Sequence, residues 1–220
     1  MIQPDEIIRS NRKTISVCIS PLGKITVRAP KRCDTGRIFA FLQEKEGWIL
    51  RQKAKTAGAG MRLPTENLHG YTFLLLGKQR QIFLDDGKTV RFDEQTDTIY
   101  LPKSNAQTKL VQWLKTNAKR IFTQQTQRIA RLMDCEYRSV SVTSAKTRWG
   151  SCSGNNALHY SFRLLYASKE VIEYVIIHEL AHTRHKNHSK LFWQEVEKYC
   201  PQWKTHRAWL KQNAIVMEIF

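Results

Sequence analysis

The chain has 220 residues, with 36 Lys and Arg against 19 Asp and Glu, which gives a formal net charge of +17 at pH 7. Its hydrophobic content of 41% and charged content of 25% are typical of a globular protein, and no apolar run reaches the length of a membrane span. The five cysteines are scattered without a CxxC pair, which fits a reducing compartment. We therefore expect a cytoplasmic protein with no membrane partner and an attraction to polyanions.

The first hundred residues predict a β-rich segment with a helical insertion. Residues 14–20 and 24–29 alternate in polarity on either side of Pro21-Leu22-Gly23, as in a hairpin. A helical pair over 35–57 follows, and Gly58 to Gly60 loosens the chain after it. Short alternating runs then predict strands over 71–76, 79–84, 89–92 and 98–101.

The second half has a different pattern. An apolar stripe predicts one long helix over 106–133, and two alternating runs predict strands over 139–143 and 157–162, joined by a loop over 146–156. Shorter helices are expected over 190–199 and around Trp203 to Leu210. The fold class is thus α+β. We expect one domain over 1–102, with its helical insertion, and a second over 103–220.

The strongest chemical motif is HExxH, which reads His178-Glu179-Leu180-Ala181-His182. Two histidines four residues apart lie on one face of a helix, and neutral imidazoles at that spacing can bind one Zn²⁺. Glu179 can serve as a base toward the water on the metal rather than as a ligand. The helix should start at an N-cap, Ser168, and end near Asn187, a candidate left-handed cap.

The third metal ligand has several candidates. His188 follows the predicted helix, where the chain can fold back toward the ion. His185 would lie roughly 10 Å from His178 along the helix axis, too far for one ion to bridge. Glu195 or Glu197 on the following predicted helix is the alternative. Three protein ligands leave the fourth position for water, which is typical of a catalytic zinc site.

Further motifs accompany HExxH along the chain. They are Arg148-Trp149-Gly150-Ser151-Cys152-Ser153, then Phe162-Arg163-Leu164, and, after HExxH, Asn187-His188-Ser189 and Phe192-Trp193. In this order they resemble the YgjP-like metallopeptidase-type family, which is related to the SprT-like and WLM zincins. The resemblance covers 103–205 strongly and the first half more weakly. It implies a small zincin-like domain with a long backing helix, a short sheet and an active-site helix, and it assigns the third ligand to His188.

Three functions are compatible with these residues. The first is a zinc-dependent metallopeptidase with Glu179 as general base, in which Arg148, Tyr160 and Arg163 are candidates to contact substrate or a developing oxyanion. The second is a pyrophosphatase-like hydrolase of nucleotides or other phosphate esters, which the positive charge would suit. The third is a nucleic-acid-associated protease, for which the long helix offers a basic face made of Lys109, Lys115, Lys119, Arg120, Arg128 and Arg131.

Overall fold

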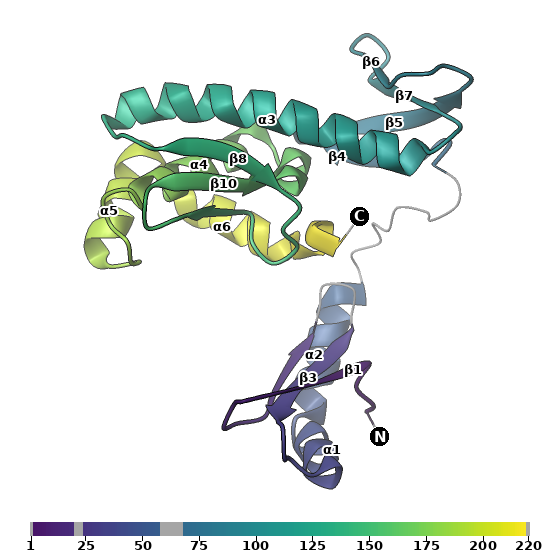
Figure 1. Cartoon of the computed structure of the whole chain (residues 1–220), viewed down its shortest axis with the longest axis vertical. Helices are drawn as coiled ribbons and strands as arrows, with labels where there is room; N and C mark the ends of the chain where they lie inside the picture. Colours follow the sequence, from purple (N-terminus) through teal and green to yellow (C-terminus); the bar gives the residue numbers. More distant parts are fainter. Residues whose placement is uncertain (1, 20–23, 58–67, 219–220) are drawn as a thin grey trace. The chain divides into compact units, whose positions relative to one another are not determined.

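The computed structural model describes residues 2–19, 24–57 and 68–218. The chain divides into two compact units, Met1–Met61 and Arg62–Phe220 (Figure 1). Within the described residues, no helix has the combination of length and apolar character that crossing a bilayer requires.

The first unit is a three-stranded sheet with two helices. Strand β3 (Ile25–Pro30) is central, parallel to β1 (Glu6–Ser10) and antiparallel to β2 (Ser16–Ile19). Helix α1 (Thr35–Glu44) and helix α2 (Glu46–Ala57) follow. The alternate residues of β3 pack against the helices, and the buried core consists of Ile25, Val27, Ala29, Ile38, Leu42 and Ile49.

The second unit begins with a four-stranded sheet in the order β4-β5-β7-β6. These strands are β4 (Thr72–Leu75), β5 (Lys78–Asp85), β6 (Arg91–Asp93) and β7 (Thr98–Pro102). The long helix α3 (Ala106–Met133) then runs from this sheet across a second one, as Figure 1 shows. A row of fully buried side chains, among them Leu110, Leu114 and Phe122, fixes which face of α3 is covered.

The second sheet is small and carries the helices that matter for function. Its order is β8-β10-β9, from β8 (Ser139–Thr143), β9 (Gly150–Cys152) and β10 (Ala157–Ser161). A short 3-10 helix, η1 (Phe162–Tyr166), leads into α4 (Lys169–Ala181). Helix α5 (Lys190–Tyr199), helix α6 (Trp203–Gln212) and a second short 3-10 helix, η2 (Ala214–Glu218), complete the unit.

The structure agrees with most of the expected elements and differs at five places. The hairpin strands, the helical pair and α3 are confirmed, whereas Pro21-Leu22-Gly23 and Gly58 to Gly60 lie outside the described residues. β1 and β9 were not expected as strands, and Phe162 opens η1 rather than ending a strand. The expected domain boundary at residue 102 lies inside the second unit, because β7 and η1 both pack against α3.

The fifth difference is the end of α4. The helix stops at Ala181, with His182 as a right-handed C-cap (φ −67°, ψ −14°), so Asn187 is not its cap. The last turn tightens because the Thr183 and Arg184 amides donate to carbonyls three residues earlier. The Thr183 hydroxyl also donates to the Leu180 carbonyl at 2.8 Å, which satisfies that end of the helix.

Candidate metal centre

Helix α4 is the element that positions the histidines. It starts at Ser168, whose hydroxyl accepts a hydrogen bond from the Val171 amide, as the sequence predicted. Its side chains are buried on nearly all sides, because α3, β9, α5 and α6 all pack against it. A helix surrounded in this way has little freedom to rotate, so the directions of His178, Glu179 and His182 are set by the packing of the unit.

Three imidazoles converge at the end of α4. One ring nitrogen from each of His178, His182 and His188 lies within 4.8 Å of the other two. The Nε2 atoms of His178 and His188 are 3.1 Å apart. Two nitrogens bound tetrahedrally at about 2.0–2.1 Å would be separated by roughly 3.3 Å, so this spacing fits a single zinc ion.

The hydrogen bonds and protonation of these rings also fit a metal. The Nδ1 of His182 lies 2.9 Å from the carbonyl oxygen of His185, which as an acceptor requires the proton on Nδ1 and leaves the Nε2 lone pair available. The Nδ1 of His178 is buried and has no hydrogen-bond partner among the described residues. Burial lowers the pKa of His178 to about 3 and also lowers that of His182, so both rings are neutral at pH 7.

Two aromatic side chains of α5 hold the rings in place. Phe192 stacks on His182 with ring centroids 4.5 Å apart, and Trp193 stacks on His188 at 5.6 Å. Trp193 is itself stacked on Trp203 of α6 at 4.1 Å. Thus His188, which no helix carries, is positioned by the ring of a neighbouring helix.

Glu179 lies against the edge strand β9. Its side chain is buried, with 6% exposure, and burial raises its pKa to about 8 against the opposing attraction of Arg148. A Cβ atom on Gly150 would lie only 2.7 Å from Oε1 of Glu179, so the glycine is required for this close approach. The sequence offered Gly150 only as part of a motif, without its contact.

Comparison with known proteins now identifies the family. Residues 13–213 match the model of the YgjP-like, metallopeptidase domain family. The chain belongs to the YgjP-like family. The expected α+β fold is confirmed, and the YgjP-like assignment supports a metallopeptidase and implies a metal cofactor.

One solved structure is similar at a greater distance. It is the metallopeptidase zymogen of Methanocaldococcus jannaschii jannalysin, with 20% identity and a TM-score of 0.39, and the match covers 42% of this chain and 95% of that one. A search of curated proteins gave no significant match.

A cleft beside β9 places one of the three candidate substrate residues of the YgjP-like chain near Glu179. Arg148 is exposed and lines this cleft together with Gly150 and His159. His159 on β10 pairs through Nδ1 with the Ser141 hydroxyl of β8 at 2.5 Å.

The other two candidates are inside the protein. Tyr160 is completely buried, packs its ring on Phe122, and has its hydroxyl 3.4 Å from that of Thr126 on α3. Arg163 is 2% exposed, and its guanidinium donates to the Ser144 carbonyl at 3.0 Å. Neither side chain is accessible to a substrate, because β10 and η1 turn both of them toward the core.

The alternative glutamate ligands are also placed elsewhere. Glu195 forms an ion pair with Arg184 at 2.6 Å, and Arg184 in turn donates to the Met133 carbonyl at 2.9 Å. Glu195 therefore ties α5 to the end of α3. Of the described residues, neither Glu195 nor Glu197 belongs to the group that could hold a metal ion together.

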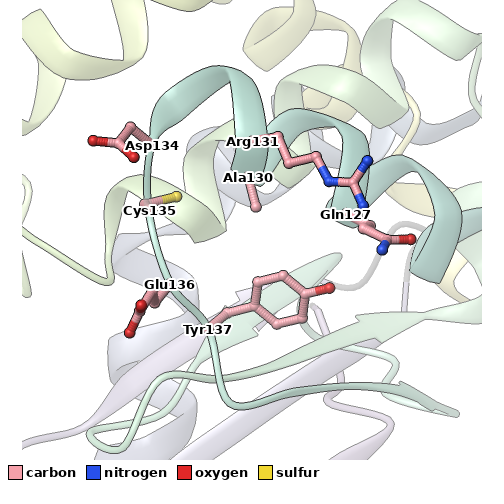
Figure 2. A pocket seen from close by; sticks show the side chains of 7 residues that line it. All are labelled: Gln127, Ala130, Arg131, Asp134, Cys135, Glu136 and Tyr137. Atoms are coloured by element: carbon pink, nitrogen blue, oxygen red, sulfur yellow. The ribbon is translucent and has the colours of Figure 1, made fainter.

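The basic face of α3 is largely occupied by contacts within the protein. Lys109 donates to the Lys88 carbonyl, Lys115 lies over the Phe162 ring, Lys119 donates to the Val140 carbonyl, and Arg128 pairs with Glu173. Arg131 lines a pocket at the end of α3, where Figure 2 shows the carboxylates of Asp134 and Glu136 across from it. The charges here are mixed, which favours a solvated helix surface over a uniform anion-binding face.

Proposed function

We propose that the protein is a zinc-dependent peptidase in which His178, His182 and His188 bind the ion and Glu179 is the general base. The observation that carries this proposal is the convergence of three imidazoles at the end of the helix that also carries the buried carboxyl group of Glu179. Zinc in such a site acts as a Lewis acid toward a carbonyl and lowers the pKa of water to about 7.

Glu179 has the position and the proton affinity for its role. A general base works best when its pKa is near the working pH, and the buried carboxyl has a pKa of about 8. It can accept a proton from the attacking water and return it to the leaving amine. Gly150 keeps the space in which the carboxyl group lies.

Arg148 is the candidate donor for a developing oxyanion or a substrate carboxylate. It is exposed at the cleft that also contains Gly150, and its charge acts on Glu179. Tyr160 and Arg163 have structural roles instead. Arg163 holds the Ser144 carbonyl and so supports the start of the loop that carries Arg148.

The test uses Glu179→Gln and His178→Ala with an unfolded protein substrate and a panel of nucleoside triphosphates. Glu179→Gln should keep the metal, measured by elemental analysis, and lose peptide hydrolysis by at least about a hundredfold. His178→Ala should lose both. A Glu179→Gln variant that hydrolyses peptide at the wild-type rate would remove Glu179 from the mechanism. Phosphate release that depends on His178, without peptide hydrolysis, would replace the peptidase by the phosphate-ester alternative.

A further inference from the structure

The two edges of the N-terminal sheet differ in a way that indicates a binding edge. β1 and β2 lie at opposite edges. β1 contains Glu6 and Arg9, whereas β2 reads Ser-Val-Cys-Ile, with neither a charge nor a proline. Soluble proteins usually protect open edges with charged residues, proline or a covering element. β2 therefore has an edge without the usual chemical protection.

The main-chain groups of β2 alternate between its partner and the open edge. The main-chain groups of Ile25 and Lys31 point toward β1, because the Ile25 carbonyl accepts a hydrogen bond from the Asp5 amide and the Lys31 amide donates one to the Ser10 carbonyl. The even-numbered residues of β3 must then face β2, which makes Thr26 and Cys18 a hydrogen-bonded pair. It follows that Val17 and Ile19 direct their N–H and C=O groups outward.

A groove beside this edge is lined by side chains of the two helices. We call it the β2 groove; its residues are Ile15, Ser16, Val17, Phe41, Lys45 and Trp48. Trp48 is 39% exposed, although the next residue, Ile49, is fully buried. The three-stranded sheet is therefore too narrow to cover the whole inner surface of α1 and α2, and it leaves Trp48 partly exposed. A fourth strand beside β2 would place every second side chain over Phe41 and Trp48.

The charge of the unit selects the kind of strand. Residues 1–61 contain twelve Lys and Arg against five Asp and Glu, a net charge of +7. Arg28 is exposed on the outer face of the sheet, and the neighbouring hollow contains Lys13, Arg32 and Arg37. Of the acidic groups nearby, Asp34 caps α1, and Glu44 forms an exposed ion pair with Lys45 of the kind that contributes little.

These charges decide between two occupants. A second copy of the chain would bring two units of +7 together, which is unfavourable. We propose that the open edge of β2 binds an acidic, extended peptide segment, which pairs as a fourth strand and covers Phe41 and Trp48. This is strand addition of the kind that gives affinity through the main chain and specificity through alternate side chains. It does not depend on the metal centre.

The experiment measures binding to the full-length chain, in the Glu179→Gln background so that the probe is not hydrolysed. The probe is a fluorescein-labelled octapeptide of alternating valine and glutamate, followed by fluorescence anisotropy. We expect saturable binding that weakens with added salt. Lys45→Glu and Trp48→Ala should each weaken it by at least about fivefold, while the matched control Leu50→Ala, on the same helix and 55% exposed but outside the groove, should leave it unchanged.

Backbone-methylated probes test the pairing itself. Methylation of the valine amides and methylation of the glutamate amides block opposite edges of the peptide, so one of the two probes should lose binding and the other keep it. An octapeptide of alternating valine and lysine is the charge control. The proposal is overturned if the unmodified probe does not bind, if both methylated probes bind equally well, or if the valine–lysine peptide binds as tightly as the valine–glutamate probe. A concentration-dependent dimer that Lys45→Glu disrupts would assign the edge to a second copy instead. Lys45 is a surface residue, so its variant remains informative if Trp48→Ala fails to fold.

Discussion

Glu179 is a carboxyl group in surroundings that favour its neutral form. It is 6% exposed, and its pKa is raised from 4.5 to about 8 by burial. Such a shift is unfavourable for stability at neutral pH, since the folded state must either hold a proton that the unfolded state releases or bury a charge. Strongly perturbed pKa values of this kind cluster at functional sites, which favours a chemical role for Glu179 over a structural one.

The raised pKa of Glu179 predicts a pH-dependent difference in stability between wild type and Glu179→Gln, both metal-free in chelator. Between pH 4.5 and about 8 the unfolded state loses the Glu179 proton while the folded state retains it, so wild type loses stability relative to the variant as pH rises. The free energy of unfolding of Glu179→Gln should exceed that of wild type by about 4 kcal/mol at pH 8 and match it near pH 4. Urea denaturation at a series of pH values measures the difference; a difference independent of pH would contradict the assigned burial.

Gly150 should be intolerant of a side chain because of Glu179. A Cβ atom at this position would meet both Oε1 and Cγ of Glu179, at 2.7 and 2.9 Å, inside a packed site. Gly150→Ala should therefore lower peptide hydrolysis by at least about tenfold with the metal content unchanged, because the base is displaced. Gly154→Ala, whose Cβ would meet nothing within 4 Å, is the control and should keep full activity.

The sequence predicts the convergence of the histidines, but not the direction of the side chains of Tyr160 and Arg163. The spacing of His178 and His182 places both on one face of a helix, so their convergence could be predicted. The positions of Tyr160 and Arg163 in the sequence do not indicate the direction of their side chains. In the structure β10 and η1 direct both into the core, where Tyr160 contacts the Thr126 hydroxyl and Arg163 donates to the Ser144 carbonyl. The sequence therefore predicted which histidines converge, and it did not predict that two of the three candidate substrate residues are buried.

Helices and strands with a clear local sequence pattern could be predicted, whereas strands that form only by pairing with a neighbouring strand could not. The stripe of α3 and the N-cap of α4 appear in the sequence and in the structure. β9 has three residues, too few for an alternating pattern, and becomes a strand because it pairs with β10. Pairing of this kind depends on the tertiary fold rather than on local preference.

Helix α5 should depend on its N-cap. The Ser189 hydroxyl accepts a hydrogen bond from the Phe192 amide at 3.4 Å, and the helix carries the rings that pack on His182 and His188. Ser189→Ala should lower the free energy of unfolding by about 1 kcal/mol, measured by urea denaturation. Ser189→Asp keeps an acceptor at the helix start and should stay close to wild type. Equal losses in both variants would show that the cap is not the cause.

At the scale of the whole molecule, the boundary between units follows from packing that composition does not reveal. Residues 68–102 are as rich in strands as the N-terminal unit, which suggested one β-rich domain over 1–102. In the structure β7 packs against α3, and β4 packs against η1, so this sheet extends the unit that holds the histidines. The sheet of residues 1–61 has a core of its own.

Two units with separate cores should respond differently to zinc. The histidines all belong to the second unit, and a ligand that binds only the folded state stabilises the unit that binds it. Zinc at about a hundred times its dissociation constant contributes about 2.7 kcal/mol, which for a unit of this size raises Tm by roughly 5–10 °C. Calorimetry with zinc and with chelator should show two transitions, of which one moves. In His178→Ala neither should move by that amount. A single transition that moves as a whole in wild type would show that the two units unfold together, and that the stability of residues 1–61 is coupled to the metal centre.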